Sequence, residues 1–127
     1  MSVQSHSDDV IVSDSALVAK AVMRAADRLG LTHKVLARVI GVSEASVTRM
    51  RRGDFPLERS QKPFELAILF IRLYRSLDAI VGGDDAAAGK WLTAPNVALG
   101  KAPLDLIQTV SGLSHVIQYL DARRAVV

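Results

Sequence analysis

Two short segments with helical periodicity lie only three residues apart, and this spacing is the strongest constraint on the fold. Residues 32–53 read THKVLARVIGVSEASVTRMRRG, with apolar residues at helical intervals on both sides of Gly41. So short a connection makes the two helices cross at a steep angle. The crossing needs a small residue, here Ala37, and the turn needs a glycine that can adopt a left-handed conformation, here Gly41.

The same spacing resembles the helix-turn-helix of phage-repressor-like (Xre) regulators, in which an Ala, a Gly, a Val-Ser pair and an inward Val recur in this order. The resemblance implies a recognition helix in the major groove, with Glu44, Ala45 and Arg49 at base-reading positions. Glu can accept from cytosine, Ala can touch a thymine methyl and Arg can donate twice to guanine. Ser46 and Thr48, on the outward face of this helix, are expected to contact phosphates. The other residues expected to contact phosphates are His33, Lys34, Arg51 and Arg52, and Ser43 completes the predicted DNA interface.

Four of these positions also have plainer interpretations. Glu44 would suit the first turn of a helix through the helix dipole alone. The pair Arg51-Arg52 would complement the dipole at the helix end, and His33 could be an ordinary exposed residue. The prediction therefore concerns the helix more than any one side chain.

Charge is concentrated in the same half of the chain. Residues 15–62 carry ten Lys/Arg against four Asp/Glu, a net +6, whereas residues 63–127 carry six of each sign and residues 1–14 hold three Asp. A basic N-terminal half joined to a neutral C-terminal half indicates a polyanion-binding module fused to a second function.

Helical periodicity continues outside the motif. A helix is predicted from Ser15 to Gly30, and a long one from Ser60 or Pro63 to about Val81. Apolar residues cover more of the long helix than the single face, or seam, that one neighbouring helix could bury. We therefore expect this helix to lie at the centre of the fold and to offer a surface for self-association. Its seam residues are Leu66, Phe70, Leu73, Leu77 and Ile80.

The rest of the chain is predicted as shorter elements. A short helix follows Gly82-Gly83, capped by Asp84 or Asp85, and residues 93–101 form an ordered loop. A further turn starts at Pro103, Gly112 interrupts it, and the last helix runs into a loose tail over residues 123–127.

These elements predict an all-α fold in which an N-terminal helix-turn-helix bundle is joined by a long central helix to a small C-terminal helical domain. The expected boundaries are a flexible leader at 1–14, the DNA-binding domain at 15–62 and a dimerisation and partner-binding domain at 63–127.

Residues 90–107, KWLTAPNVALGKAPLDLI, carry a second pattern. Their Trp-Leu, Pro-Asn, Leu-Gly and Pro-Leu pairs resemble the signature of the Xre/MbcA/ParS toxin-binding domain. The resemblance implies an antitoxin of a type II toxin–antitoxin pair, which binds its operator DNA and sequesters a RES-domain toxin that consumes NAD. It also implies that the C-terminal segment blocks the toxin's NAD pocket. The implied toxin-binding residues are Trp91, Pro95, Asn96, Leu99, Arg123 and Arg124.

Two details of this second pattern stay open. Trp91 would serve equally well as a core residue. The ending LDARRAVV lacks the glycine that many relatives have, so the two arginines could belong to a solvated terminus.

No enzyme is expected. The chain has no cysteine, and its three histidines lack metal-ligand spacing. Ser111 and His115 lie four residues apart without a nucleophile elbow, so they do not suggest hydrolysis. No cofactor is expected, and the longest apolar run, 66–71, is far shorter than the ~20 residues of a membrane span. The first 14 residues lack the basic start of a secretory signal, so we expect a cytoplasmic protein that forms a homodimer.

Two rival functions remain on the sequence alone. The first is a stand-alone dimeric helix-turn-helix repressor whose C-terminal half only dimerises. The second is a small-molecule-responsive or enzymatic C-terminal domain, for which the sequence supplies few convergent polar residues. The operator sequence, the identity of the toxin and the stoichiometry of the complex are not readable from the sequence.

Overall fold

The computed structural model describes the backbone of residues 3–55 and 57–126, and the side chains of residues 14–55 and 57–125. Within these ranges the chain is helical and contains no strand, which confirms the predicted all-α class. The helices are α1 (Val3–Leu29), α2 (His33–Ile40), α3 (Glu44–Arg51), α4 (Lys62–Val81), α5 (Asp85–Thr93), α6 (Pro103–Leu106) and α7 (Val110–Val126).

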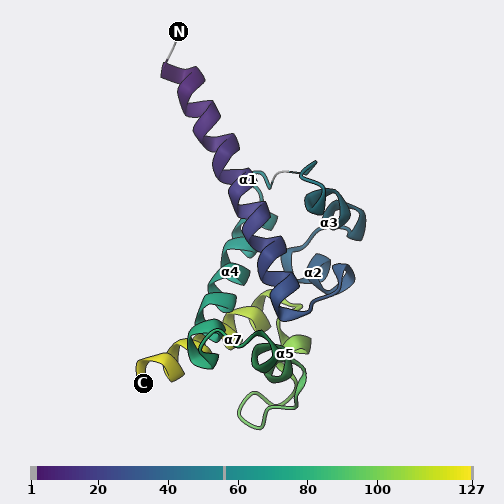
Figure 1. The fold of residues 1–127 in the computed structure, drawn as a ribbon, viewed down its shortest axis with the longest axis vertical. Helices are drawn as coiled ribbons and strands as arrows, with labels where there is room; N and C mark the ends of the chain where they lie inside the picture. The colour runs from purple at the N-terminus through teal and green to yellow at the C-terminus, as the bar shows by residue number, and fades with distance from the viewer. Residues whose placement is uncertain (1–2, 56, 127) are drawn as a thin grey trace.

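Helix α4 is the central element of the fold. It packs against α1, α2, α5 and α7, and in Figure 1 it runs from the upper part of the molecule, beside α1, to the lower part, where α5 and α7 lie. Pro63 occupies its first turn, where the missing N–H is not needed. Leu66, Phe70, Leu73 and Leu77 of the predicted seam are buried. The prediction of a long central helix is therefore confirmed.

Polar side chains and glycines fix the ends of the short helices. The hydroxyl of Thr32 accepts from the backbone N–H of Val35 at 3.1 Å, and the carboxylate of Asp84 accepts from the backbone N–H of Ala87 at 3.1 Å. Gly41 ends α2 with φ 74° and ψ 40°. Its N–H donates to the carbonyl oxygen of Ala37 at 2.9 Å, as an αL cap requires.

The N-terminal boundary differs from the prediction. Helix α1 begins at Val3, within the stretch 1–14 predicted as a flexible leader. No glycine or proline occurs before Gly30, so nothing in the sequence stops a helix from extending in the N-terminal direction. Residues 1 and 2 lie outside the described residues.

The predicted interruption at Gly112 is wrong. Helix α7 begins at Val110 and includes Gly112, whose N–H donates to the hydroxyl of Thr109 at 3.1 Å. A Cβ built on Gly112 would lie 1.9 Å from the carbonyl oxygen of Leu106. The glycine is therefore needed because α6 approaches the start of α7 closely, and not because the helix ends there.

The predicted loose tail is also helical. Helix α7 continues to Val126, so Arg123 and Arg124 lie in regular helix. Val116, Ile117 and Leu120 hold α7 in the core and carry the helix toward its end. Val127 lies outside the described residues.

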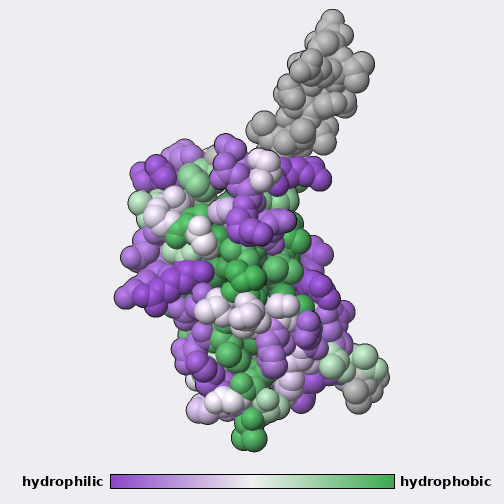
Figure 2. All heavy atoms as spheres, turned by 180° about the vertical axis from the view of Figure 1, so that it is seen from behind, coloured by the Kyte–Doolittle hydropathy of each residue, from purple (hydrophilic) through white to green (hydrophobic). Residues whose placement is uncertain are grey.

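Hydrophobic side chains are not fully covered by this arrangement. Seen from behind, they gather along the middle of the molecule with hydrophilic side chains on both sides (Figure 2). Among the described residues, none of the helices combines the length and hydrophobicity that crossing a membrane requires. The same residues contain no group of three or more acidic or histidine side chains placed to hold a metal ion.

Candidate functional site

Helix α3, the predicted recognition helix, is anchored by its inner face. The hydroxyl of Ser43 accepts from the backbone N–H of Ser46 at 3.0 Å and so caps the helix at its N-terminus. Val47 is 0% exposed and Met50 is 4% exposed. These contacts leave one side of α3 exposed to solvent, as a helix that enters a groove requires.

The exposed side of α3 carries most of the residues that the sequence predicted for DNA reading. The side chains of Glu44, Ala45, Thr48 and Arg49 are all exposed. Arg52, which is the C-terminal cap of α3, is exposed on the same side of the helix. Lys34, at the start of α2, is exposed as well. We name the set Glu44, Ala45, Thr48, Arg49 and Arg52 the α3 face.

Ser46 does not belong to the α3 face. The sequence prediction placed it outward, but its side chain is buried, with 7% exposed. Its hydroxyl lies 2.9 Å from the hydroxyl of Ser43 and accepts from a guanidinium N–H of Arg49 at 3.2 Å. Position 46 falls one turn before Met50, so it turns inward with the anchoring residues.

Arg51 and His33, both predicted as phosphate contacts, have partners within the chain. The guanidinium of Arg51 donates to both carboxylate oxygens of Asp27 on α1, at 2.6 and 3.2 Å. Its Nε donates to His33 Nε2 at 3.0 Å. The three side chains tie α3 to α1 and to the start of α2.

This ion pair changes the proton affinity of both partners. The hydrogen bond from Arg51 holds the pKa of Asp27 below its ordinary value of 3.8, against a smaller opposite effect of burial. The same hydrogen bond raises the pKa of Arg51. Both groups therefore carry their charges at neutral pH, and the bidentate geometry is the stronger form of such a pair.

Arg49 is already ordered by a neighbour. Phe55 lies in the loop that follows α3. The guanidinium of Arg49 lies over the face of the Phe55 ring, 5.2 Å from the ring centroid. A cation–π contact and a hydrogen bond to Ser46 restrict this long side chain before any ligand arrives.

A second cluster lies between α5 and α7. The rings of Trp91 and Tyr119 stack with centroids 6.3 Å apart and an angle of 20° between their planes. The guanidinium of Arg123 lies 5.6 Å from the centroid of Tyr119, and its N–H donates to the Tyr119 hydroxyl at 3.1 Å. Trp91 and Tyr119 are half-buried and Arg123 is exposed. We name these three residues the aromatic cluster.

The predicted Pro-Asn and Leu-Gly pairs shape the loop that follows Trp91. The side-chain oxygen of Asn96 accepts from the N–H of Leu99 at 3.1 Å, and its carbonyl oxygen accepts from the N–H of Gly100 at 2.8 Å. Pro95 is exposed, whereas Leu99 packs against the core. Asn96 thus stabilises the loop through hydrogen bonds within it. Val97, at the tip of the loop, is fully exposed.

The structure separates the two predicted C-terminal arginines. Arg123 belongs to the aromatic cluster, whereas Arg124 donates to the hydroxyl of Ser76 on α4 at 3.2 Å. Ser76 in turn donates to Asp121 at 3.0 Å, and Asp121 forms an ion pair with Arg72. Arg124 therefore lies on a different side of α7 from Trp91.

Sequence reasoning missed several residues that these contacts involve, among them Asp27, Tyr119 and Asp121. Asp27 is the only acidic residue between positions 15 and 43, which marks it as an expected partner for one of the surrounding cations. Tyr119 is the only aromatic residue after Trp91. Asp121 had no comparable signal, because its pairing with Arg72 depends on how α7 packs on α4.

Comparison with known proteins matches both parts of the chain. Residues 12–72 match the antitoxin Xre-like helix-turn-helix domain, and residues 76–125 match the antitoxin Xre/MbcA/ParS C-terminal toxin-binding domain. The two matches meet inside α4. The chain is also 33% identical over 98 residues to the probable mycobacterial cidal antitoxin Rv3188 of Mycobacterium tuberculosis, covering 76% of this chain and 80% of that protein.

The matches cover both the α3 face and the aromatic cluster, and they agree with the two resemblances drawn from the sequence. The chain belongs to the Xre/MbcA/ParS family of antitoxins of toxin–antitoxin systems, with an Xre-like helix-turn-helix domain followed by the family's toxin-binding domain.

Proposed function

We propose that this antitoxin acts in the cytoplasm as a homodimer that neutralises a NAD-degrading RES-domain toxin by direct binding and represses its own operon by binding operator DNA. It acts by binding and not by catalysis. The observation that carries the proposal is that each matched domain exposes its own chemically distinct surface, the α3 face in one and the aromatic cluster in the other.

The α3 face supports the DNA half of the proposal. Glu44, Ala45 and Arg49 read base edges. Lys34 meets a phosphate beside the capped N-terminus of α2, and Thr48 and Arg52 meet phosphates farther along α3. Ser43 contributes through its cap. Arg49 starts from a restricted conformation over Phe55, so less conformational entropy is lost when it binds.

A salt titration on the chain's own promoter fragment tests this half. Arg49→Ala should reduce operator affinity by about 1–3 kcal/mol and relax base preference at one position. Arg52→Ala should weaken all sequences alike and reduce the slope of log affinity against log salt by about 0.9, the value for one phosphate. If neither variant changes binding, the recognition helix has been assigned wrongly.

Arg51 and His33 act, in this proposal, by positioning α3 and not by touching phosphate. Their contacts to each other and to Asp27 support this role. Arg51→Ala and Asp27→Asn should then weaken operator binding to a similar degree and leave the salt slope unchanged. A slope that falls by about 0.9 for Arg51→Ala alone would show a direct phosphate contact instead.

The aromatic cluster supports the toxin half. A half-buried Trp and Tyr with an exposed Arg are the residue types that dominate binding energy at protein interfaces. The exposed Pro95 and the loop built by Asn96 lie next to Trp91 in the chain and extend the same surface, with Leu99 anchoring the loop. Arg124 contributes separately, from the α4 side of α7.

Co-expression with the adjacent gene tests this half. The two proteins should elute as one complex, and cellular NAD should fall when the toxin is expressed alone and recover with the antitoxin. Trp91→Ala and Arg123→Ala should each weaken the complex by on the order of 2 kcal/mol, whereas Lys20→Ala, at an exposed position of α1, should not.

Two results would contradict the toxin half. A partner that leaves NAD unchanged would exclude a RES-domain toxin while leaving the antitoxin family intact. A chain that never retains its neighbour would favour a stand-alone repressor.

A further inference from the structure

Exposed apolar side chains concentrate on one side of α4. Four large hydrophobic side chains are exposed among the described residues, and three of them, Leu17, Ile68 and Val110, are 61, 43 and 59% exposed. Leu17 and Ile68 line a groove of about 570 Å³ between α1, α4 and α7. Ile68 and Val110 line a neighbouring groove of about 420 Å³. Because Ile68 belongs to both, the two grooves form one continuous surface.

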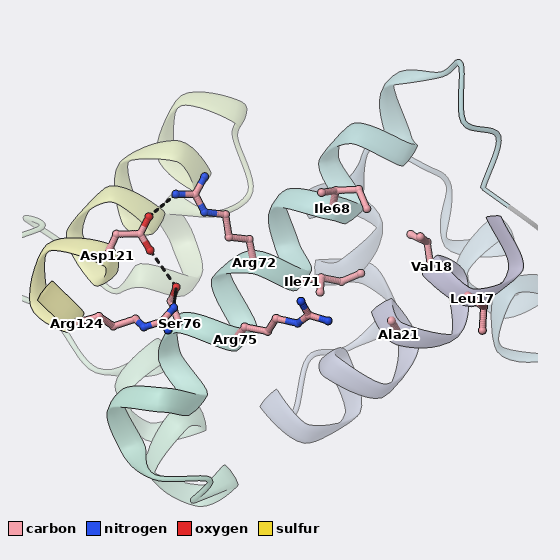
Figure 3. Close-up of a pocket in the computed structure, with 10 residues that line it drawn as sticks. All are labelled: Leu17, Val18, Ala21, Ile68, Ile71, Arg72, Arg75, Ser76, Asp121 and Arg124. Atoms are coloured by element: carbon pink, nitrogen blue, oxygen red, sulfur yellow. Dashed lines mark hydrogen bonds and ion pairs between the residues drawn. The ribbon is translucent and has the colours of Figure 1, made fainter. Parts of the chain in front are cut away.

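The larger groove has an apolar wall and a charged wall, and the side chain of Arg75 extends toward Ala21 on the apolar side (Figure 3). Leu17 and Val18 of α1 face Ile68 and Ile71 of α4 on one side. On the other side the linked side chains of Arg72, Asp121, Ser76 and Arg124 run from α4 to α7. A surface that combines apolar area with charges of both signs suits a protein partner better than a polyanion.

The outward residues of α4 are arranged symmetrically about Ile68. We name the residues Phe64, Glu65, Ile68, Ile71 and Arg72 the α4 strip. On the N-terminal side of Ile68 the strip has the apolar Phe64 and the acidic Glu65. On the C-terminal side it has the apolar Ile71 and the basic Arg72. A second copy laid antiparallel across Ile68 brings Phe64 opposite Ile71 of that copy, and Glu65 opposite its Arg72.

A two-fold interface requires this kind of self-complementarity, because the symmetry makes every pair of facing residues occur twice. Helix periodicity supports the pairing. Glu65 and Arg72 are seven residues apart and lie on the side of the strip nearest α7, while Phe64 and Ile71 share the other side. Each of the two charged residues also has a partner within its own chain. Lys62 Nζ lies 3.0 Å from Glu65 Oε2, and Asp121 forms an ion pair with Arg72.

We propose that a second copy of this chain docks on the α4 strip with α4 antiparallel, Ile68 at the two-fold axis and Glu65 opposite the second copy's Arg72. The inference rests on the homodimer of the proposed function and names its surface. No residue of the α3 face or of the aromatic cluster lines either groove, whereas Arg124 lines the larger one.

Charge reversal with rescue tests the pairing. Glu65→Arg alone and Arg72→Glu alone each place like charges opposite each other twice in the dimer, so each should raise the self-dissociation constant at least about tenfold. When the two variants are mixed, both cross-pairs become Arg opposite Glu. The mixed dimer should recover affinity close to that of the unchanged chain. Analytical ultracentrifugation of full-length protein measures all three. Lys101→Glu, which changes the charge by the same amount as Arg72→Glu, serves as a control with unchanged dimerisation.

The possible outcomes separate this inference from the proposed function. An unchanged chain that is monomeric at micromolar concentration overturns the homodimer and the strip together. A dimer that tolerates both reversals, or a mixture that shows no recovery, overturns the strip alone. Retained dimerisation with loss of the toxin complex in either variant would assign the strip to the toxin and also overturn the inference. Weakening by each variant with recovery on mixing supports it.

Discussion

Helices α3 and α7 are held in place in different ways. Helix α3 buries only Ser46, Val47 and Met50 and relies on a serine cap and an ion pair to α1. Helix α7 buries four aliphatic side chains against α4 and starts where the Leu106 carbonyl leaves no room for a side chain at Gly112. A helix that offers a polar face to a partner has little apolar contact left, so several small polar contacts must hold it. A helix fixed by packing is held firmly and tolerates little change.

The largest expected effect on stability concerns α7, the helix that is held by packing. Gly112→Ala would place a Cβ 1.9 Å from the Leu106 carbonyl oxygen, so α6 and α7 must move apart, at a cost of about 3 kcal/mol in the free energy of unfolding. Urea denaturation measures it.

Gly89→Ala is the matched control for this prediction. Its Cβ would lie 3.6 Å from the carbonyl oxygen of Leu29 at the end of α1, which is an ordinary van der Waals distance. Stability should rise by up to about 1 kcal/mol because alanine favours a helix. An equal loss at both positions would show that close packing at the start of α7 is not the cause.

Removing apolar contact from α3 should have the next largest effect. Val47→Ala deletes two methyl groups from a site that is 0% exposed, and should lower stability by about 2 kcal/mol. Differential scanning calorimetry measures the shift. A loss below about 0.5 kcal/mol would mean that polar contacts alone hold α3.

The caps of the two short helices should contribute less. Ser43→Ala removes the acceptor for the N–H of Ser46, and Thr32→Ala removes the acceptor for the N–H of Val35. Each should lower stability by about 1 kcal/mol. Only Ser43→Ala should also weaken operator binding beyond its effect on stability, because it frees the end of the recognition helix. Equal DNA effects for both would contradict that assignment.

The smallest effect is expected from the ion pair between Asp27 and Arg51. Both side chains are about half exposed, so Asp27→Asn should cost only about 0.5 kcal/mol at neutral pH. Because the pKa of Asp27 is lowered from 3.8, the contribution is present above that value and is lost as the pH falls below it. The stability difference between the two proteins should therefore shrink as the pH falls below 3.8 and through the lowered pKa of Asp27. A constant difference down to low pH would contradict an ionic contribution.

Local features of this fold could be predicted because each depends on a few adjacent residues. Thr32, Ser43 and Asp84 cap their helices through side chains that reach backbone N–H groups three residues ahead. Gly41 is recognisable because only glycine takes φ 74° without strain. The recognition helix and the central helix follow from periodicity, and the two domain types follow from resemblance.

Other features could not be predicted because they depend on packing between distant segments. Gly112 signals a break in sequence, yet the cause is a carbonyl of the preceding helix. Ser46 looks like an exposed polar residue until the inner face of α3 is known. The contact of Arg124 with Ser76 requires α7 to lie on α4, and no local pattern encodes that.

The sharing of α4 between the two domains has a consequence for insertions and deletions. Because the helix is continuous from Lys62 to Val81, adding one residue near its middle would turn everything beyond it by about 100° and shift it by about 1.5 Å. The contacts with α7 would then be lost while those with α2 survived. Length changes among relatives should therefore fall in residues 53–61 and 94–102, where the backbone can absorb them without altering the angle between the DNA-reading and toxin-binding parts.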